Sequence, residues 1–263
     1  MKKNKYEKIC FVMWSTERGD AILPVTMKRW LECSQSLGIK LYVASDSNEL
    51  QYPNVIQFNS SSWKKEWLSV ISHLKSEGYQ NIISILDDFY LLNTLSIDRF
   101  QELHKAFLEK NMGYLALEAH ASKKNILNSL TKKNRSRIEF LNKNDRYPSS
   151  LRPSIWSLEL LSSTVEESNS IWEFEHKYLP SYLYASTIRS NDQFKVRHLL
   201  EKGGVNYNII YTSKNERAAI LKSYNYDYSQ IYKMPKIVIS NILIILFGYR
   251  IHDVYDKCRH SSL

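Results

Sequence analysis

Two adjacent carboxylates, Asp87 and Asp88, follow the short apolar run Asn81–Leu86. A run of this length is typical of a strand buried on both faces, and neighbouring side chains on a strand point to opposite faces. Two bare carboxylates side by side repel each other, and a divalent cation would relieve that repulsion. Mg²⁺ and Mn²⁺ are hard cations that suit oxygen ligands and phosphate co-ligands. We therefore favour a metal site over the alternative, an acidic turn or helix cap after the strand.

A second acidic pair lies in the segment Asn169–His176, where Glu173 and Glu175 alternate with Trp172 and Phe174. Carboxylates beside aromatic rings could supply a general base with a raised pKa. The alternative is a helix start, where acids in the first turn interact favourably with the helix dipole. Spacing alone favours neither interpretation.

The glycines exclude two common phosphate-binding loops. None of the seven forms G-x-G-x-x-G or G-x-x-x-x-G-K-[ST], the loops that bring backbone N–H groups to a phosphate. A bound nucleoside diphosphate would therefore need another source of positive charge, which a metal at Asp87 and Asp88 would supply. Asp46 ends the strand-like run Lys40–Asp46 and could contact a nucleotide base or ribose, although an Asp in a turn is the commoner case.

Strand-like and helix-like segments alternate over the first half of the chain. The predicted strands and helices, in chain order, are Lys8–Ser15, Ala21–Leu37 (helix), Lys40–Asp46, Asn54–Phe58, Trp63–Glu77 (helix), Asn81–Leu86, Ile97–Lys110 (helix) and Gly113–Glu118. This order predicts an α/β, Rossmann-like fold with a mostly parallel sheet and helices on both faces. Ligands bind beyond the carboxyl ends of the strands in such sheets, so Asp87 and Asp88 would lie at the binding edge.

The second half is less regular. Its predicted elements are a helix or helix start at Ser154–Leu161, a strand at Val205–Thr212 and a helix at Ile237–Phe247. We expect a catalytic domain over residues 1–212 and a C-terminal extension over residues 213–263, with an apolar helix at 237–249. At ~1.5 Å per residue this helix reaches about 20 Å, short of a bilayer core of roughly 30 Å. It would be either buried or placed at a membrane surface.

The net charge of +9 is concentrated between Lys123 and Arg146, where eight Lys and Arg stand against two acids. Such a stretch indicates either an anionic partner (a phospholipid surface, lipid pyrophosphate, acidic glycan or nucleic acid) or a solvated surface segment. Cys10, Cys33 and Cys258 are odd in number and widely spaced, which argues for a reducing compartment. The N-terminal segment does not fit a signal peptide. We expect a cytoplasmic protein, with peripheral contact to the inner face of the cell membrane as an option.

Four segments stand out in chain order: Ser62-Trp63, Ile85–Leu91, Tyr147–Trp156 and Trp172–Glu175. Together they resemble a group of bacterial GT-A-type glycosyltransferases that are commonly found with capsule, O-antigen or lipooligosaccharide genes. The similarity extends over the first two thirds of the chain, to about residue 176. The resemblance implies a GT-A fold and transfer of a sugar from a nucleotide-sugar donor to a cell-surface glycan or lipid-linked acceptor.

The resemblance also implies roles for individual residues. Leu86-Asp87-Asp88 matches the Asp-X-Asp-like motif of the family in a form that lacks the first Asp. Asp88 is then the better ligand for Mn²⁺ or Mg²⁺, and Asp87 contacts the ribose or the metal. Glu175 is the implied acceptor-activating base, with Glu173 as the alternative, in a layout that suits inversion. The residues implied in substrate binding are Thr16, Asp46, Trp63 and Asp87 for the donor, and Arg152 and Trp156 for the acceptor.

A function of another class competes with this one: a non-catalytic, basic protein that binds anionic membrane or nucleic acid. The basic stretch and the Tyr-rich segment Ser223–Tyr232 motivate it. No recognised nucleic-acid-binding motif is present, so we expect no nucleic-acid partner. A gain in thermal stability that requires both Mn²⁺ and a nucleoside diphosphate would favour the enzyme.

Overall fold

The computed structural model describes residues 8–16, 19, 21–47, 50–58, 62–119, 138–145, 147–188, 192–201 and 204–224. The predicted helix at 237–249, nearly all of the Tyr-rich segment and the greater part of the basic stretch lie outside these residues. Within them, no helix has the length and apolar character needed to cross a membrane.

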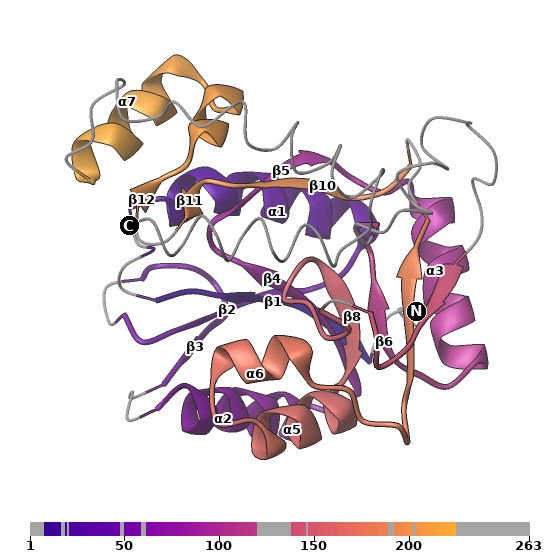
Figure 1. The fold of residues 1–263 in the computed structure, drawn as a ribbon. Coiled ribbons are helices and arrows are strands. Elements are labelled where there is room, and N and C mark those ends of the chain that lie inside the picture. The colour runs from indigo at the N-terminus through magenta and orange to yellow at the C-terminus, as the bar shows by residue number, and fades with distance from the viewer. Residues whose placement is uncertain are drawn as a thin grey trace, which may run out of the picture.

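An eight-stranded sheet forms the centre of the protein, in the order β3-β2-β1-β4-β8-β6-β9-β7 (Figure 1). Its strands are β1 (Ile9–Trp14), β2 (Leu41–Ser45), β3 (Val55–Gln57), β4 (Asn81–Leu86), β6 (Met112–Ala116), β7 (Ile138–Leu141), β8 (Ser154–Ser157) and β9 (Leu183–Thr187). All run in one direction except β8 and β7, which pair antiparallel with their neighbours. The sheet is therefore mostly parallel, which confirms the α/β class predicted from the sequence.

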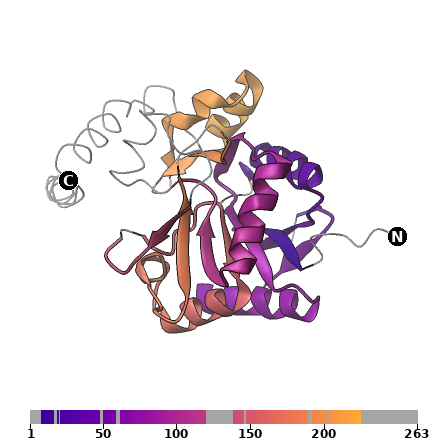
Figure 2. The same cartoon turned by 90° about the vertical axis from the view of Figure 1, so that its right-hand side faces the viewer.

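Helices cover both faces of this sheet (Figures 1 and 2). The α-helices of the described residues are α1 (Leu23–Leu37), α2 (Trp63–Ser76), α3 (Ile97–Glu109), α5 (Leu158–Glu167), α6 (Ile171–His176) and α7 (Lys214–Ser223). Helices α1 and α3 pack with Phe11 and Met13 of β1 in one buried cluster, whereas α2, α5 and α6 pack with Val12 and Trp14 in another. Because successive strand residues point to opposite faces, one buried strand supplies both layers of the core.

The helix boundaries follow the local signals in the sequence. Ser62 begins α2, and its hydroxyl accepts a hydrogen bond from the backbone N–H of Lys65 (3.4 Å). Gly38 ends α1 with a φ of 67°, and Gly78 follows α2 with a φ of 87°. Both angles lie in the left-handed region that glycine adopts without strain.

Ser154–Leu161, predicted as a helix or helix start, is a strand followed by a helix. Strand β8 pairs with both β4 and β6, and the hydroxyl of Ser157 then accepts a hydrogen bond from Leu160 N (3.2 Å) at the start of α5. A strand of four residues that is covered on both faces has no period to distinguish it from the first turn of a helix.

Val205–Thr212, predicted as a strand, belongs to a strand only at its first residue. Gly204–Val205 (β12) pairs with Leu200–Glu201 (β11), and Tyr207–Tyr211 form a 3₁₀-helix, η2. The β-branched and aromatic composition favours a strand. The side chain of Asn206 caps the 3₁₀-helix instead, by accepting a hydrogen bond from Asn208 N (3.0 Å).

The first helix of the predicted C-terminal extension packs against the main fold. Ile220 and Leu221 of α7 lie in a buried cluster with Ile22 and Val25 at the start of α1 and with Tyr90. Helix α7 is therefore anchored through side chains that reach the helix after the first strand. The boundary between residues 212 and 213 stays a prediction.

Candidate active site

The carboxyl ends of three parallel strands meet at one edge of the sheet. Trp14, the last residue of β1, is in register with the last residue of β4 and with the fourth residue of β2. Asp87 N extends the pairing by donating to the Trp14 carbonyl (3.1 Å). Thr16, Asp46 and Asp87 follow these strands and lie at the edge where ligands bind in parallel sheets.

Two hydrogen bonds from the first strand end hold the Asp87 carboxylate. Ser15 Oγ donates to Asp87 Oδ2 (2.8 Å), and Thr16 N donates to the same oxygen (3.4 Å). Burial raises the pKa of Asp87 to about 7; the Ser15 hydroxyl opposes this shift, and the charge of Asp88 adds to it. Asp87 is thus a fixed and poorly solvated carboxyl group, whose anionic form a nearby cation would favour.

Gly19 leaves room for this carboxylate. A Cβ at Gly19 would lie 1.7 Å from Asp87 Oδ2 and 2.6 Å from Asp87 Cγ, so the side chain would have to move. We predict that Gly19→Ala displaces the carboxylate from Ser15 and lowers the free energy of unfolding by about 1–3 kcal/mol, as loss of a buried hydrogen bond does. Urea unfolding would measure this. The cost should be smaller in a Ser15→Ala background, where the hydrogen bond is already absent.

Gly113→Ala is the matched control for that experiment. A Cβ at Gly113 would lie 2.6 Å from Leu160 Cδ2 and 3.0 Å from Tyr182 Cβ, in a different part of the core. This variant should also destabilise the protein, but by the same amount with or without the Ser15 hydroxyl. Equal costs of Gly19→Ala in the two backgrounds would show that Gly19 does not act through Asp87.

A two-stranded antiparallel ribbon brings a distant residue to Asp88. Strand β5 (Phe89–Asn93) follows the acidic pair directly and pairs with β10 (Lys195–His198). Leu199 N extends the pairing by donating to the Asp88 carbonyl (2.8 Å). The ribbon is a separate sheet that lies beside α1 in Figure 1. It places His198 next to the acidic pair.

His198 contacts Asp88 through its side chain. His198 Nδ1 lies 3.1 Å from Asp88 Oδ2, and the imidazole packs edge-on against Phe89 with ring centroids 4.5 Å apart. Asn208 Nδ2 donates to the His198 carbonyl (2.9 Å) and fixes this part of the backbone. No local motif marks His198, and 110 residues separate it from Asp88, so its place beside the acidic pair could not be predicted from the sequence.

The residues at Asp88 fit a divalent cation. Asp88 Oδ1 is buried without a hydrogen-bond partner in the described residues, although a buried carboxylate oxygen normally has one. A carboxylate oxygen beside an imidazole nitrogen is a ligand pair that suits Mn²⁺. The described residues contain no group of three or more His, Cys, Asp or Glu side chains that could hold a metal. This part of the chain would therefore supply a partial coordination shell, to be completed by water and by phosphate oxygens of a ligand.

Glu173 has the environment of a helix-capping residue. Glu173 Oε2 accepts hydrogen bonds from Asn169 N (2.9 Å) and Asn169 Nδ2 (3.1 Å), and Ser170 Oγ accepts one from Glu173 N (3.1 Å). The hydrogen bonds from Asn169 lower the pKa of Glu173. These contacts match the helix-start interpretation for this acid.

Glu175 lies two residues further along α6 in the opposite environment. Burial raises the pKa of its carboxyl group; a hydrogen bond from Leu151 N to Oε1 (3.2 Å) and the positive charges of His176, His198 and Arg152 act against that shift. Oε2 has no hydrogen-bond partner in the part of the chain that the structure describes. A partly desolvated carboxylate with one open oxygen is suited to take up a proton.

Arg152 and Trp63 lie near different residues of α6, Arg152 near Glu175 and Trp63 against Phe174. Arg152 Nη1 forms an ion pair with Glu118 Oε2 (3.1 Å), in which the Arg152 side chain is 44% exposed and that of Glu118 is 10% exposed. The glutamate thus holds a guanidinium that still faces solvent. Trp63 is half-buried and packs edge-on against Trp67 and Phe174, with centroids 6.2 and 6.3 Å apart.

Trp156, which the resemblance implies in acceptor binding, lies in the core of the structure. Its side chain is fully buried, its Nε1 donates to Ser154 Oγ (2.9 Å), and its ring packs against Tyr114 with centroids 4.7 Å apart. Trp156 belongs to β8, whose neighbours on both sides enclose it. Its contacts are therefore those of a core residue, and its role in acceptor binding stays a prediction.

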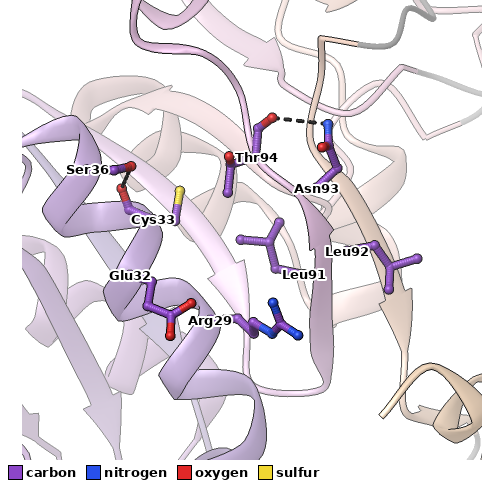
Figure 3. A pocket seen from close by; sticks show the side chains of 8 residues that line it. All are labelled: Arg29, Glu32, Cys33, Ser36, Leu91, Leu92, Asn93 and Thr94. Atoms are coloured by element: carbon purple, nitrogen blue, oxygen red, sulfur yellow. Dashed lines mark hydrogen bonds between the residues drawn. The ribbon is translucent and has the colours of Figure 1, made fainter. Parts of the chain in front are cut away.

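A pocket of about 350 Å³ lies apart from these residues, between α1 and β5 (Figure 3). It is lined by Arg29, Glu32, Cys33, Ser36, Leu91, Leu92, Asn93 and Thr94. None of the site residues predicted from the sequence is among them. Burial raises the pKa of the Cys33 thiol to about 12, so the pocket offers no reactive thiolate at neutral pH.

No family model and no curated protein matches the sequence. Solved structures with partial similarity include S. aureus TarS (residues 1–349), with a TM-score of 0.45 at 11% identity over 71% of this chain and 59% of that chain. UDP-glucose pyrophosphorylase complexed with UDP-glucose gives 0.44 at 10% identity, over 83% and 98%. A cytidylyltransferase from Leptospira borgpetersenii gives 0.36 at 8% identity, over 65% and 69%. The match spans less than two thirds of the TarS structure, and these scores support no conclusion about function.

Proposed function

We propose that this protein is a nucleotide-sugar-dependent glycosyltransferase of the GT-A type, which transfers a sugar with inversion to a cell-surface glycan or lipid-linked acceptor. The observation that supports this most is the pairing of Asp88 with His198 beside Asp87, at the carboxyl edge of the parallel strands. Glu175 lies close enough to this pair for the charge of His198 to affect its pKa. A metal ligand pair and a separate carboxylate base are the two components that such a transfer needs.

In this proposal the acidic edge binds the donor. Asp88 and His198 would hold Mn²⁺ or Mg²⁺, and a bound cation would offset negative charge on the departing nucleoside diphosphate. Asp87, held by the end of β1, contacts the ribose or the metal. The nucleoside lies against Thr16 and Asp46, which follow β1 and β2, and against Trp63 at the start of α2.

Glu175 is the proposed general base. It accepts the proton of the acceptor hydroxyl while that oxygen bonds to the anomeric carbon of the donor sugar. The bond between this carbon and the diphosphate oxygen breaks in the same displacement, and the nucleoside diphosphate leaves with the electron pair. Arg152, held by Glu118 and near enough to lower the pKa of Glu175, binds the acceptor next to the base.

Ligand-dependent stability tests this function. We predict that Mn²⁺ together with the preferred nucleoside diphosphate raises Tm by roughly 5–10 °C at about 100 times Kd, because binding to the folded state alone stabilises it by mass action. Neither component alone should give this shift. The measurement is a thermal-denaturation panel of uridine, guanosine, cytidine, adenosine and thymidine diphosphates, each with and without Mn²⁺ and Mg²⁺.

The outcomes of this panel separate the competing functions. If neither Mn²⁺ nor any of the nucleotides shifts Tm, and the protein binds anionic vesicles or RNA, the basic interaction protein is favoured. If a nucleotide binds, the released product identifies the reaction, because glycosyl transfer yields a nucleoside diphosphate whereas nucleotidyl transfer yields pyrophosphate.

We also propose that the basic stretch at residues 123–146 keeps the enzyme near an anionic membrane, which vesicle co-sedimentation would test.

A further inference from the structure

Trp172 is the most exposed large hydrophobic side chain among the described residues, at 72%. Its ring has no aromatic partner in the described part of the chain, whereas Trp14, Trp67 and Trp156 are all buried. A single exposed hydrophobic side chain is common on protein surfaces. The position of Trp172 relative to the candidate base is what makes it informative.

Trp172 lies on the same side of α6 as Glu175. Residues three and four apart are neighbours on a helix surface, and three residues correspond to a separation of about 60° around the axis. Trp172 is therefore adjacent to both Glu175 and His176, while the buried Phe174 points to the other side, into the core with Trp67. The indole and the carboxylate of the proposed base are therefore neighbours along one side of α6.

A second segment extends this surface. Residues 147–151 run alongside α6, because Ser149 Oγ donates to the Lys177 carbonyl and Leu151 N donates to Glu175 Oε1. The ring of Tyr147 packs on that of His176, with centroids 4.6 Å apart. Tyr147 has a φ of 56°, a left-handed conformation that is strained for a bulky residue and recurs at ligand sites.

We propose that Trp172 is the platform on which the acceptor sugar ring stacks, so that its reacting hydroxyl faces Glu175. The inference rests on the glycosyltransferase function proposed above and adds that the acceptor's terminal unit is a sugar. A sugar ring has an apolar C–H face and a polar rim. An exposed indole offers the matching flat apolar surface, and Glu175, His176 and Arg152 offer hydrogen-bonding groups for the rim.

The charge around Trp172 favours a sugar over a membrane. A side chain that inserts into an anionic bilayer is normally flanked by Lys and Arg. Trp172 is instead followed directly by Glu173 and is one helical turn from Glu175. Lys177 and Lys64 lie near Glu173, and Arg152 lies near Glu175, so the surroundings carry both signs of charge and not a cluster of cations alone. The two carboxylates can accept hydrogen bonds from hydroxyl groups.

Fluorine NMR of protein labelled with 5-fluorotryptophan tests the inference. The protein has six Trp, and the Trp172 resonance is the one missing from the Trp172→Phe variant. We predict that methyl glycosides of glucose, galactose and N-acetylglucosamine, titrated with and without Mn²⁺ and nucleoside diphosphate, shift this resonance selectively. Trp172→Ala should weaken glycoside binding by about 2- to 12-fold, the value of an aromatic stacking contact. Saturation transfer to the sugar protons would measure this binding. Trp172→Phe should restore most of it.

Phe140→Ala is the matched control, since it removes another aromatic ring that is 49% exposed, on β7. It should leave glycoside binding unchanged. If none of the glycosides shifts the Trp172 resonance, or if only anionic vesicles shift it, the sugar platform is refuted. Mn²⁺-dependent nucleotide binding would in that case still support the proposed function. A shift with glycosides but no nucleotide binding would refute the proposed donor instead.

Discussion

Asp88→Asn is expected to lower kcat/KM for nucleotide-sugar turnover by about 10²- to 10⁴-fold, which corresponds to the several kcal/mol that a bound metal supplies. The substitution keeps the shape of the side chain and removes its charge. Asp88 Oδ1 is buried without a partner in the described residues, and Oδ2 lies 3.1 Å from His198. The lost charge therefore affects both the cation and the imidazole. Initial rates against Mn²⁺ concentration, with free Mn²⁺ followed by electron paramagnetic resonance, would measure the effect.

Comparison of His198→Gln with Asp88→Asn would show whether the side chains of His198 and Asp88 bind the same ion. If they do, the single variants each weaken Mn²⁺ binding, and the double variant loses much less than the sum of the two losses, because residues that share a partner are not additive. Additive losses would mean that His198 acts elsewhere. Asn208→Ala should have a milder effect of the same kind, since Asn208 reaches the site only through the His198 carbonyl.

Asp98→Asn is the control for the loss of a negative charge. Asp98 is an exposed acid in the first turn of α3, and the strand β5 separates it from Asp88 along the chain. Its replacement should change the rate and the affinity for Mn²⁺ by no more than about twofold, as is usual for a surface substitution. Full Mn²⁺-dependent turnover by Asp88→Asn, with normal binding of the ion, would refute the assignment of Asp88.

The half of the sheet that bears Asp87 could be predicted because its signals are local. Strands β1, β2 and β4 are short apolar runs, and Ser62, Gly38 and Gly78 mark the helix boundaries between them. Once these strands are parallel, the residues after them must lie at one edge. The order of segments in the sequence thus determines where the acidic pair lies, without knowledge of any long-range contact.

The partner of Asp88 could not be predicted, because a long-range pairing brings it there. His198 ends a four-residue strand whose only partner in the described chain is β5, and that pairing joins segments 110 residues apart. Strand β8 poses the same problem, since β4 and β6 on either side make it a strand, while its own four residues also fit a helix start. A sequence pattern describes a single segment, whereas pairing with neighbouring strands determines whether that segment is a strand or a helix.

The aromatic and acidic residues in the second half of the chain show a further limit of prediction from the sequence. Trp156 and Trp172 both lie in segments that the sequence marks as candidates for the site, yet one is fully buried and the other 72% exposed. Glu173 and Glu175 are equivalent by spacing, and only the Asn169 hydrogen bonds to Glu173 and the burial of Glu175 separate them. The members of each pair differ in their side-chain environments, and the spacing of residues in the sequence does not determine those environments.

Glu175→Gln is expected to lower sugar transfer by about 10²- to 10⁴-fold, the usual contribution of a general base. Binding of Mn²⁺ and nucleoside diphosphate should be unchanged, because Glu175 is assigned to the acceptor. The Gln side chain can still accept the hydrogen bond from Leu151 N, so the local backbone is preserved. Single-turnover rates combined with donor titrations would separate the lost chemistry from binding.

The pH dependence follows from the raised pKa of Glu175. The carboxylate must be ionised to take a proton, and burial disfavours ionisation, while His176, His198 and Arg152 favour it. The acidic limb of the rate profile should therefore lie above the ordinary range of a glutamate, with the rate rising as the pH increases. The titration of the metal-binding residues is kept out of this comparison by measuring every rate at saturating Mn²⁺.

Stability should change in the opposite sense to activity. Because the folded-state pKa is above the unfolded-state value, Glu175 contributes most to stability below the unfolded pKa, and this contribution is lost as the pH rises through the folded pKa. Glu175→Gln should therefore be more stable than wild type at neutral pH, with a gain that disappears in acid. Glu173→Gln is the matched control: it replaces a capping carboxylate whose pKa is lowered, so it should keep transfer activity and gain no stability at neutral pH. If Glu173→Gln abolishes transfer while Glu175→Gln retains it, the roles of these two acids are reversed and the base is the capping residue.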